Sequence, residues 1–188
     1  MKTTIDQIIQ SYTASGLNKE LNGITNIQDA VKSQYYDGTQ YRCCSHQYRV
    51  RKKALDDLLD KLEGEIIKIK AVKDFDELYD VVDNIRVKHI GYLTIYDISL
   101  RIGYMQNPKI LPQKYVYLHA GAMVGAMTLY NKGLLKVKPV HKMNVQDFNF
   151  LSKIMQLDSV SHSIPNGATF AMLVESFLCS KHNELSLL

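Results

Sequence analysis

A pair of helices joined by a short turn is predicted between Asp74 and Met105, and this pair constrains the fold more than any other segment. Asp74 is followed three residues later by Glu77, which is the spacing of a capping box at a helix N-terminus. Apolar residues then recur every three or four positions as far as Ile85, as on the buried face of an amphipathic helix. The first helix is therefore expected to begin next to Asp74 and to pack through one apolar face.

The turn between the two helices is expected over residues 87–93. Thr94 and Asp97 also have capping-box spacing, so the second helix is predicted to open at Thr94. Ile90 is expected to fill the gap between the helices, and Gly91 to adopt a turn conformation that a Cβ would hinder. The amide groups at the start of the second helix would form a seat for a phosphate. The alternative is an ordinary αα-hairpin whose turn only connects two packed helices.

The rest of the chain shows the same helical periodicity, and long alternating strand patterns are absent. A strand is expected only within the connector 134–142. At 188 residues the chain fits a single all-α domain, 1–188, with a multi-helix core. We expect N-terminal helices in 1–72, the helix pair in 74–105 and C-terminal helices in 113–188. The individual helices are predicted near 5–15, 26–36, 45–72, 113–132, 144–155 and from Ser163 onward.

One predicted helix has a face almost without side chains. Gly121 and Gly125 are flanked by alanines in the segment AGAMVGAM. Because glycine weakens a helix, this face is expected to have a packing reason, most simply another helix lying close against it.

The charges are separated along the sequence. From Arg86 to Lys153 ten Lys or Arg stand against two acids, giving +8, whereas from Asp56 to Asp83 ten acids stand against four lysines, giving −6. This separation favours a surface that binds a polyanion, and the basic block begins at the predicted turn. The alternative is that the two blocks interleave in the folded chain and cancel.

The composition favours a cytoplasmic protein without a membrane partner. No apolar run approaches the roughly 20 residues of a membrane-spanning helix, and the N-terminus lacks the apolar core of a signal peptide. Three cysteines, two of them adjacent, do not form a disulfide framework, which fits a reducing compartment.

The segment 35–53 interleaves tyrosines with cations. Such a mixture suits stacking on bases and binding of phosphates; it equally suits a helix start whose tyrosines pack inward while its cations reach solvent, the interpretation we favour. The residues are Tyr35, Tyr36, Tyr41, Tyr48, Arg42, Arg49, Arg51, Lys52 and Lys53. A small-molecule site apart from the turn would be sought from Arg42 to Arg49, around His46 and Gln47.

Cysteine and histidine occur together at two places, and each has the spacing of half a zinc site. The residues are Cys43, Cys44 and His46, and then Cys179 and His182. The two halves would have to meet in the folded chain, and buried free cysteine is the common alternative, so we assign no metal and no cofactor. The sequence contains no phosphate loop, dinucleotide fingerprint, nucleophile elbow or metalloprotease helix.

From Ile85 to Leu135 the sequence resembles the core of the helix-hairpin-helix DNA glycosylase superfamily. In that family the hairpin and its second helix are followed by a proline-bearing loop and a Val-Asp-Thr-His-Val segment that leads into another helix. Here the same order holds, with Pro108 and Pro112 in the loop and Val-Tyr-Leu-His-Ala at 116–120. The resemblance implies a glycosylase-like core that holds the backbone of duplex DNA without reading its sequence.

The chain departs from the family at the positions that carry its chemistry. His89 stands where the family's hairpin usually has its first glycine, and Gly91 keeps the second. Leu93 replaces the Schiff-base lysine of bifunctional members, and Tyr117 replaces the catalytic aspartate. The four-cysteine iron–sulfur pattern of some members is missing. The resemblance therefore implies fold and DNA contact without the usual catalytic groups.

Three functional hypotheses follow. The first is a protein that binds double-stranded DNA, with contacts expected from Lys88, His89, Gly91, Tyr92, Thr94, Arg101, Lys136 and Lys138. The second is a base-excision enzyme, an N-glycosylase-like hydrolase acting on an alkylated or otherwise modified base. Its non-standard catalytic residues would be Tyr117, His119 and Asp97, whose structural alternatives are a helix cap for Asp97 and a link between helix ends for the other two. The third is a helical interaction module that binds no nucleic acid.

Overall fold

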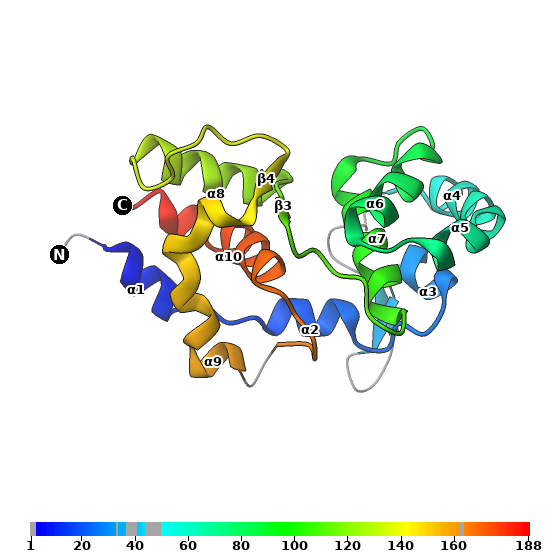
Figure 1. Ribbon diagram of the computed structural model, residues 1–188, viewed down its shortest axis with the longest axis horizontal. Helices are drawn as coiled ribbons and strands as arrows, with labels where there is room; N and C mark the ends of the chain where they lie inside the picture. The colour runs from blue at the N-terminus through cyan, green and yellow to red at the C-terminus, as the bar shows by residue number, and fades with distance from the viewer. Residues whose placement is uncertain (1–2, 33, 37–40, 44–49, 162–163) are drawn as a thin grey trace. The chain divides into compact units, whose positions relative to one another are not determined.

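The computed structural model describes residues 3–32, 34–36, 41–43, 50–161 and 164–188, and of 34–36 and 41–43 it describes the backbone alone. The contacts divide the chain into two compact units (Figure 1). Unit 1 comprises Met1–Asn18 and Pro112–Leu188, and unit 2 comprises Lys19–Leu111. The single domain expected from the chain length stays a prediction.

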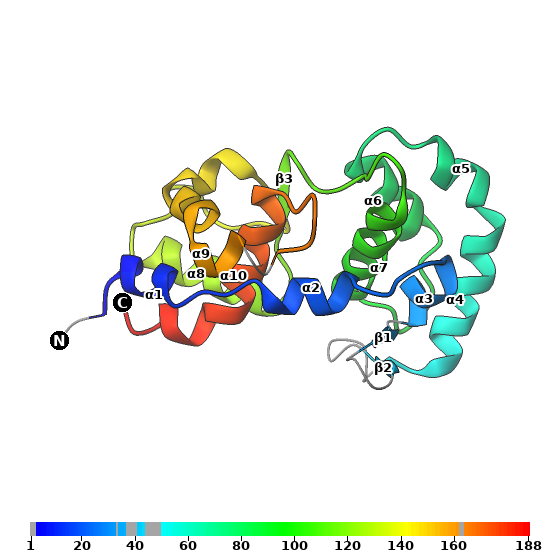
Figure 2. The same cartoon turned by 90° about the horizontal axis from the view of Figure 1, so that it is seen from below.

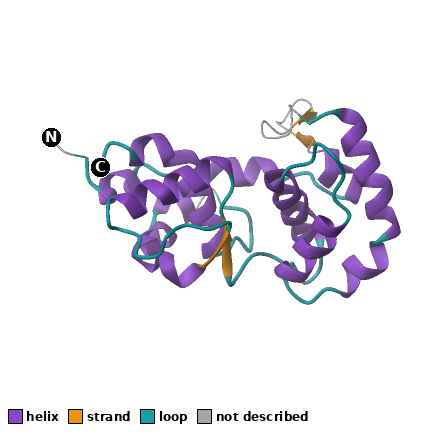
Figure 3. Ribbon diagram, turned by 90° about the horizontal axis from the view of Figure 1, so that it is seen from above, coloured by secondary structure: helices purple, strands orange, loops and turns teal. Residues whose placement is uncertain are grey.

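Both units are mostly helical, as predicted, and each also contains a short antiparallel pair of strands (Figure 3). The prediction of a strand only within 134–142 is wrong. The strands are β1 (Gln34–Tyr36) with β2 (Tyr41–Cys43), and β3 (Tyr115–Tyr117) with β4 (Lys142–Asn144). Each strand has three residues, which is too short for the alternation of polar and apolar positions to be visible in the sequence.

Unit 2 is built around α6 and α7, which lie side by side (Figure 2). Its helices are α3 (Ile27–Lys32), α4 (Lys52–Gly64), α5 (Ile66–Ala71), α6 (Phe75–Asn84) and α7 (Tyr92–Met105), and α2 (Ser15–Leu21) has residues in both units. The helix predicted over 45–72 is interrupted at Glu65, directly after Gly64. The backbone angles of Glu65, φ −101° and ψ 5°, are not those of an α-helix. Glycine in a helix favours such a break.

The predicted cap at Asp74 is confirmed. Its Oδ1 accepts a hydrogen bond from the backbone N–H of Glu77 at 2.9 Å. The Glu77 carboxylate accepts in turn from the backbone N–H of Lys73 at 2.8 Å, one residue before the position that a capping box requires. Asp74 therefore satisfies one of the amide groups that the first turn of α6 cannot satisfy internally.

Replacing Asp74 with alanine is expected to lower the free energy of unfolding by about 1 kcal/mol, because the Glu77 amide loses its acceptor. The matched control is Asp80→Ala, which removes an exposed carboxylate from the same helix away from its N-terminus. We expect the control to cost less than about 0.5 kcal/mol. Urea unfolding followed by circular dichroism measures both, and equal losses would contradict a role for the cap.

The second predicted capping box, Thr94 with Asp97, is wrong. Helix α7 begins at Tyr92, and Gly91 is its N-cap with extended backbone angles of φ −90° and ψ 168°. Thr94 and Asp97 consequently lie inside the helix, and both side chains are buried. The spacing of a capping box also occurs within a helix, so it does not by itself locate the first turn.

Unit 1 contains the helices that lie outside the central part of the chain. They are α1 (Ile5–Gln10), α8 (Ala120–Asn131), the 3-10 helix η1 (Val145–Gln156), α9 (Asp158–Ser161) and α10 (Phe170–Leu185). The helix predicted from residue 113 begins only at Ala120, because β3 precedes it. The last helix starts at Phe170, where the Thr169 hydroxyl accepts from the Met172 amide at 3.3 Å and donates to the Pro112 carbonyl.

The small face of α8 packs against α10, which confirms the predicted close approach of another helix (Figure 1). A Cβ added at Gly125 would lie 2.6 Å from the carbonyl oxygen of Leu178, and one added at Gly121 would lie 3.2 Å from Cys179 Sγ. Glycine at these positions therefore lets two helix backbones approach. In the part of the chain that the structure describes, no helix combines the length and the apolar character needed to cross a membrane.

Candidate nucleic-acid interface

The turn between α6 and α7 is closed by backbone hydrogen bonds. The Arg86 amide donates to the Asp83 carbonyl at 3.0 Å, and the Ile90 amide donates to the Val87 carbonyl at 3.2 Å. The Ile90 side chain is buried, as predicted for a residue that fills the gap between the two helices. These contacts leave Lys88 and His89 exposed at the tip of the turn.

The conformation that glycine favours occurs at His89 and not at Gly91. His89 has φ of +74°, in the left-handed region, where histidine is uncommon and glycine is at ease. Gly91 has φ of −90°, and no described atom lies within 4 Å of a Cβ added there. The prediction that Gly91 needs to be glycine for this turn is therefore wrong, and the strained position lies two residues earlier, at His89.

The N-terminus of α7 follows directly after the turn. Its N-cap is Gly91, which has no side chain to satisfy the amides of the first turn. A helix of 14 residues presents partial positive charge at this end. The arrangement suits an anion approaching the exposed tip of the turn.

The turn forms a cavity of about 240 Å³ together with the start of α4. The residues that line it are Arg51, Lys53, Ala54, Asp57, Val87, Lys88 and His89. Three cationic side chains thus face one carboxylate, which already pairs with Lys53 at 3.2 Å. This concentration of positive charge was not predicted for the turn: Arg51 and Lys53 come more than 30 residues earlier in the sequence, and only the packing of α4 brings them there.

Tyr92 stands next to the turn with a half-exposed ring. The Arg86 guanidinium carbon lies 4.2 Å from the centre of the Tyr92 ring. Its Nη2 donates to the tyrosine hydroxyl at 3.4 Å, and this hydrogen bond raises the pKa of Arg86. Since Arg86 also pairs with Asp83 at 3.2 Å, the tyrosine is held in place by a cation that is itself anchored on α6.

The eight residues predicted to contact DNA do not share one surface. Those of the turn and of the start of α7 are exposed in unit 2: Lys88, His89, Gly91 and Tyr92. Thr94 and Arg101 are buried, and Arg101 is only 1% exposed, with its guanidinium donating to the Ala30 carbonyl at 3.3 Å. These two cannot form part of a surface. Lys136 and Lys138 are exposed but belong to unit 1.

The basic block from Arg86 to Lys153 is likewise divided between the two units. Several of its cations have structural partners: Arg86 pairs with Asp83, Lys153 pairs with Asp6 at 2.9 Å, and Lys136 donates to the Gly133 carbonyl at 2.8 Å. Charge counted along the sequence therefore overstates the charge that any one surface of a unit presents.

Two of the three residues predicted to be catalytic lie together in unit 1. Tyr117 is in β3 and not at the head of a helix, and His119 is the N-cap of α8. The His141 ring lies 4.2 Å from the His119 ring and 6.3 Å from the Tyr117 ring, measured between centroids. Asp97 belongs to unit 2, so neither unit assembles all three groups. Base excision stays a prediction.

Sequence reasoning missed His141, which is the residue immediately before β4. It joins this cluster because β4 pairs with β3. Its Nδ1 is 3.3 Å from the Leu118 carbonyl oxygen, and the Leu118 amide donates to the His141 carbonyl at 2.7 Å. His119 is 5% exposed, and its burial, together with the neighbouring His141, lowers its pKa to about 3. The imidazole of His119 is therefore neutral near pH 7.

The structure describes some of the cysteine, histidine and tyrosine–cation residues that the sequence singled out for a metal or a small molecule. Cys179 is half-buried, and His182 Nδ1 lies 2.6 Å from its carbonyl oxygen. Among the described residues, no group of three or more His, Cys, Asp or Glu could hold a metal ion. Outside the described residues lie Cys44, His46, Gln47, Tyr48 and Arg49, together with the side chains of Tyr35, Tyr36, Tyr41, Arg42 and Cys43. The zinc pairing and the polar pocket around His46 stay predictions.

Comparison with known proteins identifies no relative: no family model matches the chain, and neither the curated proteins nor the solved structures contain a match.

Proposed function

We propose that this protein binds double-stranded DNA through the sugar–phosphate backbone, with the turn between α6 and α7 acting as a helix-hairpin-helix. The observation that carries the proposal is the cavity shared by the turn and the start of α4, where Arg51, Lys53 and Lys88 converge. The resemblance of residues 85–135 to helix-hairpin-helix glycosylases supports the same contact and implies a glycosylase-like core.

The proposed contact surface differs from the one predicted: it leaves out four of the predicted DNA contacts and adds two cations of the segment 35–53. From the turn it contains Lys88, His89, Gly91 and Tyr92, and from α4 it contains Arg51 and Lys53. Lysine ammonium groups and backbone amides bind phosphate oxygens and carry no sequence information. We therefore infer binding that is similar for all duplex sequences, with Tyr92 packing against a sugar beside the bound phosphates.

Binding to a duplex of arbitrary sequence is expected to depend steeply on salt. If the surface neutralises roughly three phosphates, the logarithm of the association constant should fall with the logarithm of salt concentration at a slope of about −2.7. Between 50 and 200 mM salt the affinity would then fall by roughly fortyfold. Fluorescence anisotropy of a labelled duplex measures this slope, and an affinity that does not respond to salt would overturn the proposal.

The variant Lys88→Ala tests the turn itself, in the same assay. It is expected to weaken binding to all duplexes alike and to bring the salt slope closer to zero by about 0.9, because one phosphate contact is lost. The matched control is Lys61→Ala, which removes the same charge from an exposed position in the last turn of α4. If the two variants behave alike, the effect is one of net charge, and the turn is not the contact.

A further inference from the structure

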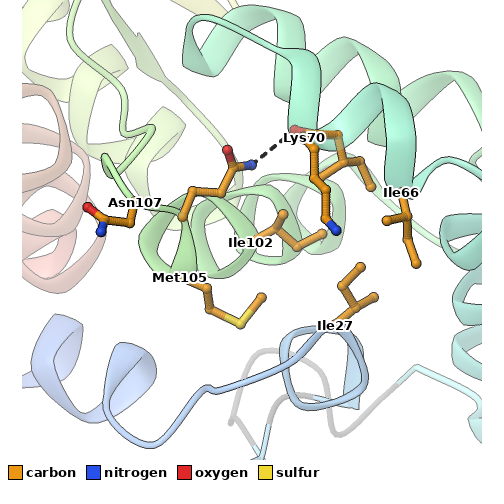
Figure 4. A pocket seen from close by; sticks show the side chains of 8 residues that line it. Ile27, Ile66, Lys70, Ile102, Met105 and Asn107 are labelled. Carbon is orange, nitrogen blue, oxygen red and sulfur yellow. Dashed lines mark hydrogen bonds between the residues drawn. The ribbon is translucent and has the colours of Figure 1, made fainter.

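A second cavity in unit 2 is lined by residues that take no part in the proposed DNA contact. Its volume is about 340 Å³. Its wall is mostly apolar and comes from three parts of the chain: Ile27 of α3, Ile66 and Ile69 of α5, and Ile102 and Met105 of α7 (Figure 4). This size and lining are typical of sites for small organic molecules.

The polar groups of the cavity are few and differ in kind. Lys70 extends from α5 between Ile66 and Ile102, with its amino group directed toward Ile27 across the space (Figure 4). Gln106 is oriented by the bond from its Nε2 to the Ile69 carbonyl at 3.2 Å. Asn107 adds a second amide at the edge. None of the residues that line the cavity, all of them described, is acidic.

We propose that this cavity binds a small organic anion with an aliphatic body, of the size of a medium-chain carboxylate. The carboxylate would accept a hydrogen bond from the Lys70 ammonium, since a charged donor favours a charged acceptor. The aliphatic chain would lie against the isoleucines and Met105. Each methylene removed from water strengthens binding by about fourfold, so a chain of several carbons carries most of the affinity.

The chemistry of the wall selects against other ligands. A cationic amphiphile would meet the Lys70 ammonium without a lining carboxylate to balance it. A neutral alcohol of the same length would gain the apolar contact and lose the ionic one. The site therefore predicts an order of affinity in which the carboxylate exceeds the alcohol and the alcohol exceeds the amine.

Octanoate, octanol and octylamine titrated into the full-length protein, with binding followed by calorimetry and ligand-observed NMR, test this order. We expect saturable binding of octanoate, about tenfold weaker binding of octanol, and the weakest binding for octylamine. Absence of saturable octanoate binding would overturn the proposal. So would octanol binding as tightly as octanoate.

Three variants locate the site. Lys70→Gln is expected to weaken octanoate about tenfold and to leave octanol unchanged. Lys68→Gln is the matched control, because Lys68 is a cation of the same helix that pairs with Glu65 at 2.7 Å and does not line the cavity. It is expected to change neither affinity.

Ile66→Trp, which fills the space from its edge, is expected to abolish binding of both ligands while the protein stays folded by circular dichroism. Full octanoate affinity in Lys70→Gln or in folded Ile66→Trp would show that the anion binds elsewhere.

Discussion

Replacing Gly103 with alanine is expected to lower the free energy of unfolding of unit 2 by about 3 kcal/mol. The added Cβ would overlap the carbonyl oxygen of Ile110 and lie 3.2 Å from Cδ2 of Leu78. The segment at Ile110 cannot simply move away, because its amide donates to the Gly103 carbonyl at 2.9 Å. The higher helix propensity of alanine offsets only about 1 kcal/mol of this cost.

The matched control is the same substitution at Gly64, near the end of α4. No described atom lies within 4 Å of a Cβ added there, so the control is expected to be neutral or to stabilise the protein by up to about 1 kcal/mol. Urea unfolding followed by circular dichroism compares the two variants with the parent. A Gly103→Ala protein as stable as the parent would mean that the segment after α7 does not lie against it.

The stability of unit 1 is expected to fall as the pH is lowered from about 6.5 to 3, because His119 is buried in its neutral form. Its pKa in the folded protein is about 3, whereas the unfolded chain has the ordinary value of about 6.5. Between these two values the unfolded state binds a proton that the folded state does not, so acid favours unfolding. The expected loss is about 2 kcal/mol between pH 6.5 and pH 5, and roughly 4–5 kcal/mol by pH 3.

The substitution His119→Gln is expected to flatten this dependence between pH 6.5 and 5. The comparison is between slopes, so a lower stability of the variant at neutral pH does not affect the test. His89→Gln, at an exposed position in the turn of unit 2, is the control and should keep the slope of the parent. If the parent and His119→Gln lose stability equally on acidification, other groups govern the acid response of this protein.

Much of the helical structure follows from local sequence. The cap at Asp74 was predicted because an aspartate oxygen can satisfy a first-turn amide three residues away, without help from the rest of the fold. The burial of Ile90 and the close contact at Gly125 were also predictable, since each follows from the size of one side chain within a periodic pattern. The mostly helical fold was predicted by the same periodicity.

The candidate site was predictable only in part. The turn, predicted over 87–93, was located because two periodic segments flank it, and Lys88 is exposed there. The start of α7 was not located correctly, because Thr94 and Asp97 have the spacing of a capping box although they lie inside the helix. Their burial depends on how α7 packs against α6 and α3, which the spacing of two polar residues does not encode.

Tertiary structure alone decided which charges act together. Arg101 belongs to the basic block of the sequence but is buried and bonded to Ala30, whereas Arg51 and Lys53 reach the turn from a helix that precedes it. His119 is next to His141 only because β3 pairs with β4. Sequence by itself determines hydrogen bonds and periodicities within a few residues. The burial of a charge and the convergence of side chains depend on long-range packing, and for that reason they appeared only in the folded chain.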